Sequence, residues 1–350
     1  MANFAGMIAV TGGTGMVGAH LLFELLKKGE KVRALKREHS SLKEVKRLFE
    51  RKNGEGRRMF SEIEWVEGDL LDLPSLERLF EDVDEVYHTA ALVSFEGGDK
   101  NRLLENNIEG TANVVNLLLD KKGVKLCHVS SIAALGRMSD VHKLIDENTH
   151  FSTSLSPSVY SVSKYESERE VWRGIEEGLD ACIVNPSVIL GPGNWEKGSA
   201  KLFKTVFDGL KFYTAGMNGF VGVDDLVEVM LRLMKEHVMG ERFIVSAENV
   251  SYRQLFEWMA ESLGVSPPRW KAGPILSGMA WRALQLRQHL TGKRSSITKE
   301  TAKTAQQIYR YNHSKLKNKL DFTFTPIREV VEKTAKMFLE DHGLKKSDFT

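Results

Sequence analysis

The amino-acid sequence predicts an α/β fold, with a doubly wound parallel sheet and a smaller, mainly helical C-terminal lobe. A short apolar run at residues 7–10 is followed by a glycine-rich turn at 11–18 and then by an amphipathic helical pattern. Similar apolar runs and helical patterns alternate through the first half of the 350-residue chain. Helical periodicity dominates from residue 250 onward. Strands that alternate with helices favour a parallel sheet covered on both faces.

Composition and charge narrow the possible function classes. The formal net charge is +2 at pH 7 and the pI is near 8.3, so nothing calls for nucleic acid as a partner. Basic residues gather between positions 27 and 58, but glutamates interrupt them, which is typical of a solvated face. No uninterrupted apolar stretch approaches the roughly 18 residues of a membrane-spanning helix. We therefore expect no membrane span.

The cysteines and the N-terminus indicate a reducing compartment. Cys127 and Cys182 each lie inside an apolar run, so we expect buried core thiols rather than a disulfide or a metal pair. We expect no metal site. Residues 1–26 lack the basic start and the unbroken apolar core of a secretory signal. The prediction is a cytoplasmic protein.

The glycine-rich turn is the strongest single signal. Gly12, Gly15 and Gly18 follow a predicted strand and open a predicted helix. Glycine permits positive φ and close backbone approach, so a diphosphate can bind the exposed N–H groups at the positive end of the helix. The alternative is a purely structural tight turn. We interpret the N-terminal half as a nucleotide-binding βαβ domain.

The second predicted strand, at residues 31–35, ends beside two basic residues. In dinucleotide folds this strand end faces the adenosine ribose, where an acid binds the 2′-hydroxyl and an arginine binds a 2′-phosphate. Residues 31–37, from the start of this strand to Glu38, contain no Asp or Glu. Arg37 therefore favours NADP(H) over NAD(H), although Lys36 and Arg37 could also be solvated residues at the start of a loop.

The pattern continues with alternating elements as far as residue 120. A helix is predicted at 41–49, a charged loop at 53–58 and a strand at 63–66. Asp69 follows that strand and could receive an adenine amino group, whereas Asp72 is the better N-cap for a helix at 74–80.

A strand at 83–88 leads into the small residues Thr89, Ala90 and Ala91, against which a cofactor could lie. The next helix is expected to begin at Asn107 and to end near residue 120.

The fifth strand, at 124–129, ends at Ser130 and Ser131. The carboxyl edge of a parallel strand is where doubly wound folds place their chemistry. A further helix carries Tyr160 and Lys164, which are four residues apart and therefore lie on one face. An ammonium near the phenol would lower the pKa of Tyr160 toward neutral pH and suit it to acid–base work.

The second half of the chain adds a strand at 181–185, a helix at 223–237 that returns to the sheet, and a strand at 242–246. Four C-terminal helices follow, at 252–263, 275–290, 299–307 and 327–339, the last capped by Thr325 and Pro326. We interpret the helix at 275–290 as packed inside the protein rather than lying on a membrane.

These elements resemble the extended short-chain dehydrogenases/reductases, a family of nucleotide-sugar epimerases, dihydroflavonol reductases and hydroxysteroid dehydrogenases. The resemblance covers most of the chain and follows the family order. Its motifs are TGGTGMVG (11–18), GDL (68–70), HTAA (88–91), NIEGT (107–111), VSSIAALG (129–136), YSVSK (160–164) and NPSVILGPG (185–193).

The resemblance implies a Rossmann domain at residues 1–189 plus 222–247, and a substrate lobe at 190–221 plus 248–345 that forms a lid. It makes Tyr160 the proton donor or acceptor, Lys164 the residue that holds the nicotinamide ribose, and Ser131 the substrate hydrogen-bonding group. Ser130 would be structural. Asn107 would brace the site through backbone contacts, or cap its helix. The residues implied in cofactor binding are Thr11, Gly12, Gly15, Met16, Val17, Gly18, Arg37, Asp69, Leu70, Thr89, Ala90, Ala91, Asn107, Pro186, Ser187 and Val188.

Three functions fit this set. The favoured one is an NADP(H)-dependent oxidoreductase that reduces a ketone or aldehyde, or oxidises the alcohol, as dihydroflavonol reductases do. The second is an NAD-dependent nucleotide-sugar epimerase. A sugar 4,6-dehydratase fits less well, because Ile132 and Ala133 occupy the positions of its Asp-Glu pair. The third is a cofactor-binding regulatory protein without turnover.

The substrate is expected to be a small carbonyl or alcohol compound. Plant dihydroflavonol reductases carry an asparagine five residues after the catalytic serine, and Gly136 stands there in this chain. This difference argues against a flavonoid. The candidate lining is largely apolar and favours a hydrophobic substrate; it comprises Val93, Phe95, Leu135, Met138, Phe151, Phe212, Tyr213 and Met217. The resemblance also implies a homodimer.

Overall fold

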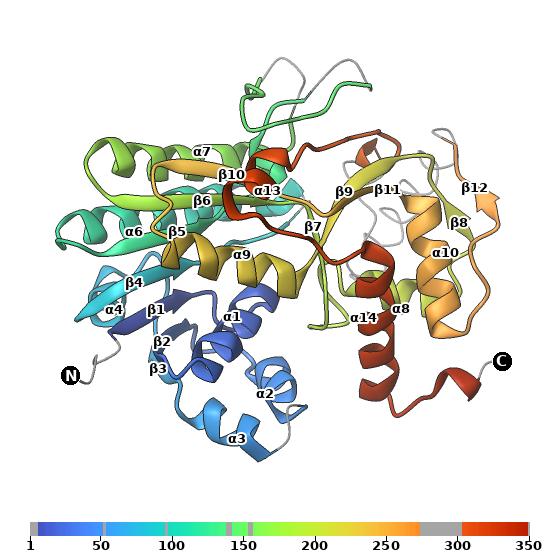
Figure 1. The fold of residues 1–350 in the computed structure, drawn as a ribbon, viewed down its shortest axis with the longest axis horizontal. Coiled ribbons are helices and arrows are strands. Elements are labelled where there is room, and N and C mark those ends of the chain that lie inside the picture. The colour runs from blue at the N-terminus through green and yellow to red at the C-terminus, as the bar shows by residue number, and fades with distance from the viewer. Residues whose placement is uncertain are drawn as a thin grey trace.

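The computed structural model describes residues 6–51, 54–94, 97–137, 142–152, 157–273 and 303–348. Its centre is a seven-stranded sheet in which every neighbouring pair is parallel (Figure 1). In spatial order the strands are β10 (Glu241–Val245), β6 (Asp180–Pro186), β5 (Lys125–Val129), β4 (Val83–His88), β1 (Met7–Thr11), β2 (Lys31–Lys36) and β3 (Glu64–Glu67).

The strand order reverses between β1 and β4, so the sheet is doubly wound as predicted. The chain runs from β1 outward to β2 and β3, then crosses to β4 on the other side of β1. The loops that follow β1 and β4 therefore meet at the carboxyl edge of the sheet. In open α/β sheets this switch point is where a ligand binds.

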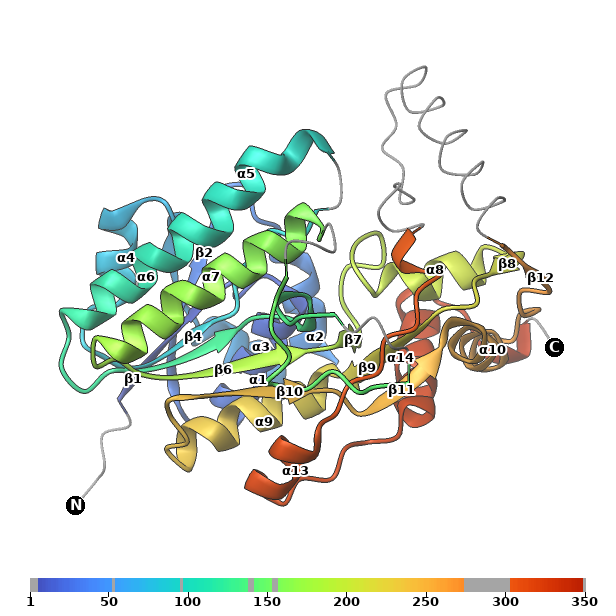
Figure 2. The ribbon, with the colours of Figure 1, turned by 90° about the horizontal axis from the view of Figure 1, so that it is seen from above.

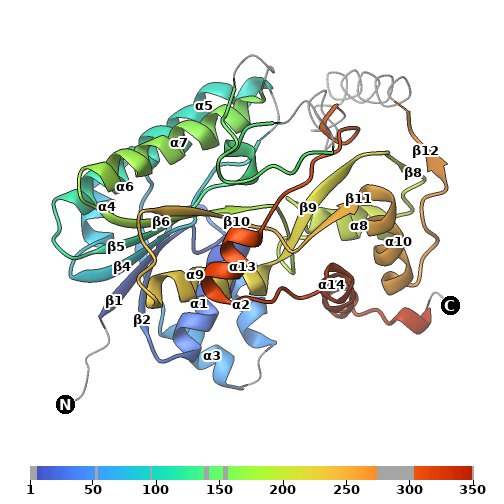
Figure 3. The ribbon, with the colours of Figure 1, turned by 45° about the horizontal axis from the view of Figure 1, so that its top comes forward.

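Helices cover both faces of the sheet (Figure 3). The helices on one face are α1 (Met16–Lys27), α2 (Lys43–Glu50), α3 (Gly54–Ser61) and α9 (Val223–Lys235). Those on the other are α4 (Leu73–Leu79), α5 (Lys100–Leu104), α6 (Gly110–Leu119) and α7 (Val159–Glu176). Successive residues of β1 alternate between the two cores, because Ile8 and Val10 join one buried cluster and Ala9 joins the other.

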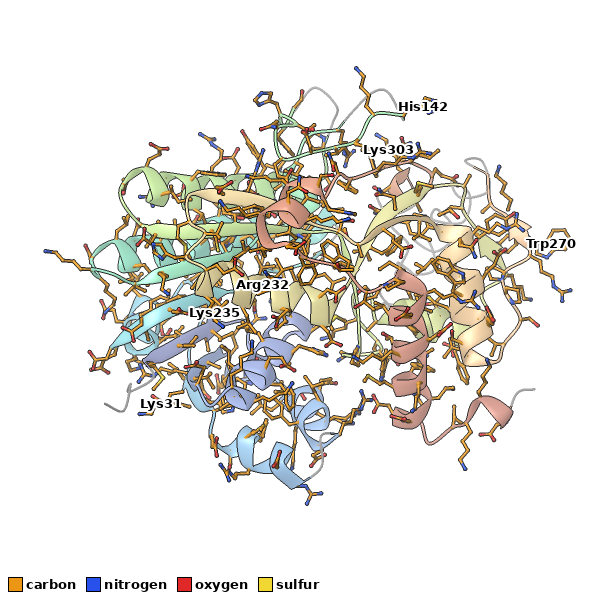
Figure 4. All side chains as sticks on the ribbon, in the orientation of Figure 1. Lys31, His142, Arg232, Lys235, Trp270 and Lys303 are labelled. Carbon is orange, nitrogen blue, oxygen red and sulfur yellow. The ribbon has the colours of Figure 1, made fainter. Side chains whose placement is uncertain are left out.

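A second group of elements stands beside the carboxyl edge of the sheet (Figure 2). Its three-stranded sheet contains β7 (Val188–Leu190), β9 (Met217–Gly222) and β11 (Glu248–Ser251), and a two-stranded sheet pairs β8 (Phe212–Tyr213) with β12 (Trp270–Lys271). Its helices are α8 (Lys201–Phe207), α10 (Tyr252–Leu263) and α14 (Ile327–Asp341). Trp270 on β12 and Lys31 on β2 lie toward opposite ends of the long axis (Figure 4).

The remaining elements are short. Helix α13 (Ser314–Leu320) packs beside β10. The single turns are η1 (Gly97–Asp99), η2 (Glu105–Glu109), η3 (Ile132–Ala134) and η5 (Lys346–Asp348), of which η2 is π-helical.

Most predicted elements are present within a residue or two of their expected bounds, and β4 and α10 match at both ends. Two predictions were wrong, and a third, the Asp72 cap, was right in its position only. Residues 54–58 of the loop predicted at 53–58 are part of helix α3, and residue 53 lies outside the described residues. A helix was expected to begin at Asn107, but the helical segment begins at Lys100 and continues through α5, η2 and α6. Asp72 stands at the N-cap of α4, but its side chain makes no cap hydrogen bond.

The remaining predictions concern the C-terminal helices, the cap of α14, the two lobes and a membrane span. The predicted helix at 275–290 lies outside the described residues, and the one at 299–307 is described only from residue 303. Pro326 is the N-cap of α14, as predicted, whereas Thr325 is not, and the Thr325 hydroxyl donates to the Asp225 carboxylate. The division into two lobes stays a prediction. Among the described residues, no helix combines the length and apolar character needed to cross a bilayer.

Candidate active site

The glycine turn joins β1 to α1 and leaves its backbone open at the start of the helix. Gly15 is the N-cap of α1, and no side chain caps it. Gly12 has φ +72°, and a Cβ there would lie 2.6 Å from the Ala90 backbone nitrogen. A Cβ on Gly18 would lie 2.3 Å from the Gly12 carbonyl oxygen. The turn therefore needs glycine at both positions, and it forms the kind of cradle that binds a diphosphate.

The residues beside this turn tie β1 to β4. The Thr11 hydroxyl bonds His88 Nδ1 at 2.7 Å and accepts from the Ala90 N–H at 3.3 Å, and the Thr89 hydroxyl donates to the Thr11 carbonyl at 2.7 Å. On its other side, His88 Nε2 bonds the Thr111 hydroxyl at 3.0 Å. The Thr11 hydroxyl thus faces the interior. Thr89 and Ala90 are half-buried and Ala91 is exposed.

The end of β2 presents a cation, as the ribose-phosphate hypothesis requires. Lys36 is held by Glu67 at 2.6 Å, and this hydrogen bond lowers the pKa of Glu67. Arg37 is exposed, and its backbone bonds Ser40: the Arg37 N–H donates to the Ser40 hydroxyl at 3.2 Å, and the Arg37 carbonyl accepts from the Ser40 N–H at 2.9 Å. Among the residues that the structure describes, its guanidinium has no salt-bridge partner. Arg37 therefore offers free N–H donors where a 2′-phosphate would bind.

Asp69 and Leu70 follow β3. One Asp69 carboxylate oxygen accepts from the Leu71 N–H at 3.1 Å, which shapes the turn. The Leu70 carbonyl accepts from the Asn113 amide at 3.0 Å, and its side chain is buried against Gly110. The position of Asp69 after the third strand suits an adenine contact, and that role stays a prediction.

Ser131 and Tyr160 meet at the carboxyl edge of the sheet. Ser131 follows β5, and its hydroxyl accepts from the Ala133 N–H at 3.1 Å. Tyr160 lies in the first turn of α7, which begins because the Ser158 hydroxyl accepts from the Ser161 N–H. The two predicted catalytic side chains share a hydrogen bond. Burial raises the pKa of Tyr160, and the bond with Ser131 partly opposes that rise.

Lys164 lies one turn further along α7 and is 2% exposed. Its Nζ donates to the Val129 carbonyl at 3.0 Å. Burial lowers the pKa of Lys164 to about 8, and the charge of Glu168 opposes this shift. The expectation that Lys164 lowers the pKa of Tyr160 was wrong for this structure. The Tyr160 pKa is raised, because desolvation dominates and the ammonium is directed at the end of β5.

A buried carboxylate beneath these groups was missed by the sequence reasoning. Glu168 Oε2 accepts from the Ser130 hydroxyl at 2.6 Å and from the Asn185 amide at 2.7 Å, while Oε1 accepts from Arg242 at 2.8 Å. The same Asn185 amide donates to the Ser131 carbonyl at 3.1 Å. Ser130 is therefore bonded inside the protein, as its structural role implies. The sequence signal that could have found Glu168 is its spacing, because it follows Lys164 by one helical turn and so lies on the same face of the helix.

Asn107 lies inside the π-turn η2, so its alternative role as a helix N-cap was wrong. Its amide oxygen accepts from the Leu92 N–H at 2.7 Å, and its amide nitrogen donates to the Leu92 carbonyl and the Ser163 hydroxyl, each at 3.0 Å. Asn107 thereby fixes the loop after β4 to helix α7. This is the bracing geometry that the resemblance implies.

The segment after β6 reaches the same edge. Pro186 ends β6, and the buried Ser187 donates its N–H to the Val245 carbonyl at 3.0 Å before β7 begins at Val188. Further along, a Cβ on Gly193 would lie 3.2 Å from the Met16 side chain. The 186–193 segment and the start of α1 are therefore neighbours, as two sides of one cofactor site must be.

The structure does not gather all of the predicted substrate lining. Phe95 and Met138 lie outside the described residues. Phe151 stacks on Tyr165, with ring centroids 4.2 Å apart, and Phe212 pairs with Trp270 across β8 and β12. Leu135 is buried in a cluster with Ile145, Ile244 and Tyr311. Val93 is exposed after β4, and Met217 begins β9.

Cys127 and Cys182 are free and buried, which confirms the prediction of core thiols. Within the described ranges, no group of three or more His, Cys, Asp or Glu side chains is arranged to hold a metal ion.

Comparisons with known proteins agree with this geometry. Residues 8–246 match the model of the NAD dependent epimerase/dehydratase family. The chain is 32% identical to sterol demethylase protein B of Methylococcus capsulatus, over 77% of this chain and 79% of that one. It is 27% identical to a putative dihydroflavonol 4-reductase of a Synechocystis species, over 97% and 96% of the two chains.

Among solved structures, the fold is similar to the UDP-glucose 4-epimerase of Thermus thermophilus in complex with NAD. The TM-score is 0.72 with 20% identity, and the match covers 95% of this chain and 98% of that one. At this identity the likeness concerns the fold. The family match and the reductase-named relatives agree with an NAD(P)-dependent oxidoreductase, and the chain belongs to the NAD dependent epimerase/dehydratase family.

Proposed function

We propose that this protein is an NADP(H)-dependent reductase of a hydrophobic ketone or aldehyde. The observation that carries the proposal is the hydrogen bond between Tyr160 and Ser131 at the edge of the sheet, with the buried Lys164 one helical turn away. These are an acid, an orienting hydroxyl and a cation in one site. The relatives named as reductases support this reaction class.

Each of the three side chains has a distinct task in this reaction. A bound NADPH supplies hydride to the substrate carbonyl carbon. Ser131 hydrogen-bonds the carbonyl oxygen and orients it toward Tyr160. The raised pKa of Tyr160 keeps the phenol protonated at neutral pH, so it can donate its proton to the oxygen as negative charge develops there. Lys164, whose ammonium lies at the end of β5, would hold the nicotinamide ribose.

The cofactor preference rests on Arg37. A free guanidinium at the end of β2 suits a 2′-phosphate, whereas an NAD-specific site would present a carboxylate to the ribose. We expect calorimetric titration of nucleotide-free protein to show NADPH bound at least about tenfold more tightly than NADH, roughly 1.4 kcal/mol. Arg37→Asp should reverse the preference, and Arg57→Asp on α3 is the control. An unchanged ratio in Arg37→Asp would remove Arg37 from the phosphate site.

The substrate class follows from Gly136 and from the relatives. A Cβ at position 136 would lie 1.9 Å from the His150 carbonyl oxygen, so this position has no room for a side chain that grips a flavonoid. A relative 32% identical to this chain is named as a sterol demethylase. We therefore propose a steroid-sized or similarly apolar ketone, and a screen of such ketones with NADPH tests it.

The epimerase alternative makes a different prediction for the same titration. An epimerase retains its NAD through the cycle, so a preference for NADH, or a nucleotide that cannot be removed, would replace the reductase proposal. The screen would then use nucleotide sugars.

Tyr160→Phe is the direct test of the proposed acid. Losing only the hydroxyl should lower kcat by a factor on the order of 10³ or more while NADPH affinity stays within about twofold. Tyr165→Phe is the matched control, because it removes a phenol five residues further along the same helix. Retained activity in Tyr160→Phe would show that another group supplies the proton.

We propose, finally, that the protein is a homodimer, which rests on the resemblance to its family. Light scattering at several protein concentrations should give twice the chain mass of 39.4 kDa. A constant monomer mass at micromolar concentration would contradict it.

A further inference from the structure

Arg137 stands out among the charged residues near Ser131. It is half-buried, and its guanidinium carbon lies 5.5 Å from the centre of the Tyr309 ring. Among the described residues no carboxylate forms a salt bridge with it, and no hydrogen bond of its guanidinium is found. Partly buried arginines are normally paired, because the charge is costly to desolvate. The positive charge of Arg137 is thus available to a ligand.

The surroundings of Arg137 connect it to the catalytic loop. The loop after β5 carries Ser131 at one end and Arg137 at the other, and Ile132 between them packs with Tyr309 against a buried cluster. Close to Arg137, the Gly136 N–H donates to the Thr149 carbonyl at 3.2 Å. Both ends of this loop are therefore held, Ser131 by the Asn185 amide and Gly136 by the Thr149 carbonyl.

The same cluster reaches the other side of the site. A Cβ on Gly219 would lie 2.9 Å from the Tyr311 ring and 3.0 Å from Ser187 Cβ. Tyr311 belongs to the cluster against which Tyr309 packs, and Ser187 is a predicted cofactor-binding residue. Tyr309 itself donates its N–H to the Met217 carbonyl at 3.0 Å, which anchors it to β9. The cluster that contains Tyr311 thus has Ile132, the neighbour of Ser131, packed on it and lies close to Ser187 on its other side.

The position of the Arg137 guanidinium over the Tyr309 ring suits one kind of ligand. A guanidinium that lies over an aromatic ring is oriented by the ring face, and its N–H groups point outward in the guanidinium plane. That edge matches the two oxygens of a carboxylate. One unpaired cation balances one negative charge, which favours a carboxylate over a doubly charged phosphate.

We propose that Arg137 binds a carboxylate on the substrate, so that the enzyme acts on a hydrophobic keto or hydroxy acid. This inference rests on the proposed function and names its substrate class more closely. The apolar body of the substrate would lie along the wall of the cluster, and the carboxylate would lie at Arg137 while the carbonyl lies at Ser131.

Matched acids and esters test this proposal. Reduction by NADPH would be measured for 4-acetylbenzoate and 3-oxo-5β-cholan-24-oate, each beside its methyl ester, which spans a short and a long spacing of carbonyl and carboxylate. In at least one pair the wild type should prefer the acid by about tenfold in kcat/KM. Arg137→Met should abolish that preference through KM while it leaves ester turnover within about twofold.

The variants separate the effect of losing the positive charge from the effect of disturbing the fold. Methionine keeps the apolar stem that covers Tyr309, Arg137→Lys should retain part of the preference, and Arg57→Met is a control on an exposed arginine of α3. The proposal is overturned if the wild type discriminates by less than about threefold in both pairs, or if Arg137→Met slows acid and ester equally. If no ketone is reduced by wild type and NADPH does not bind, the proposed function fails instead.

Discussion

Lys164 and Glu168 are two buried, opposite charges separated by one turn of α7. Burial lowers the pKa of Lys164 to about 8, and without Glu168 it would fall further, because that carboxylate raises it. His88 and His128 also face Lys164, and its charge is among the causes that lower their pKa values. Both histidines are neutral near pH 7, so Glu168 is the group whose charge stabilises the ammonium.

This arrangement predicts a pH dependence. Below pH 8 Lys164 is an ammonium and would hold the cofactor ribose through charge-assisted hydrogen bonds, and above pH 8 it loses its charge. The kcat for carbonyl reduction should therefore fall as the pH rises through about 8. Glu168→Gln should move that limb to lower pH, on the order of 1 pH unit, because the stabilising charge is gone.

The measurement is kcat against pH for the wild type, Glu168→Gln and Glu170→Gln. Glu170 is on the same helix but pairs with Arg173 at 3.0 Å, so the limb of that variant should match the wild type. If Glu168→Gln lowers kcat equally at every pH, Glu168 has a structural role through Ser130 and Asn185 and does not tune Lys164.

At the scale of elements, the sequence predicts well where a local pattern decides the structure. The turn at Gly12 and Gly18 is such a case, because a strand, a glycine spacing and a helix follow one another directly. The start of α7 at Ser158 and the same-face placement of Tyr160 and Lys164 are also local consequences of a cap and a four-residue spacing.

Other elements depend on partners far away in the chain. Helix α3 contains Gly54 and Gly56, and these glycines predict a loop. The helix depends on the packing of Gly56 against the Phe49 backbone, which the local sequence does not show. The small sheet forms because β9 pairs with both β7 and β11. The Glu168 carboxylate accepts hydrogen bonds from Asn185 on β6 and Arg242 on β10. No local sequence pattern shows that these three residues meet.

The glycine turn supports a prediction about the whole strand–turn–helix unit. In Gly18→Ala the new methyl group would lie 2.3 Å from the Gly12 carbonyl oxygen and 2.8 Å from Gly13 Cα. Helix α1 must then move away from the turn, which disturbs the N–H groups of the cradle. NADPH affinity should fall at least about tenfold in calorimetric titration.

Gly54→Ala is the matched control for this prediction. A Cβ at Gly54 would meet nothing within 4 Å, and the residue begins helix α3, so its variant should bind NADPH like the wild type. Wild-type affinity in Gly18→Ala would mean that the turn tolerates the displacement and that diphosphate binding does not depend on this close approach.

At the scale of the whole molecule, long-range polar contacts join the C-terminal segment to the sheet and its helices. Asp341 at the end of α14 accepts from Arg47 on α2 at 3.2 Å and from the Trp195 indole at 2.7 Å, and it also pairs with Arg51. The Thr325 hydroxyl and the Asp225 carboxylate add a second link, at 2.8 Å. Helix α14 and the residues just before it therefore stabilise the layer that carries the glycine turn.

Buried histidines make the folded molecule sensitive to acid. Burial lowers the pKa of His20 and His128, and lowers that of His88 to about 3. Below the unfolded-state pKa of about 6.5 the unfolded chain binds protons that the folded chain excludes, so stability falls as the pH falls. For His88 alone, the loss between pH 7.5 and pH 5 is about 2 kcal/mol, and it continues to grow until about pH 3.

His128 provides the variant that tests this account. Both of its ring nitrogens are buried without a hydrogen-bond partner in the described structure, so His128→Leu removes a group that costs free energy to bury. Urea unfolding should give this variant equal or higher stability at pH 7.5 and a smaller loss at pH 5 than the wild type shows. His39→Leu, at a side chain that is 91% exposed, should keep the wild-type loss. Equal losses in His128→Leu and the wild type would mean that His128 titrates alike in the folded and unfolded chains, and acid sensitivity would then have to arise from other groups.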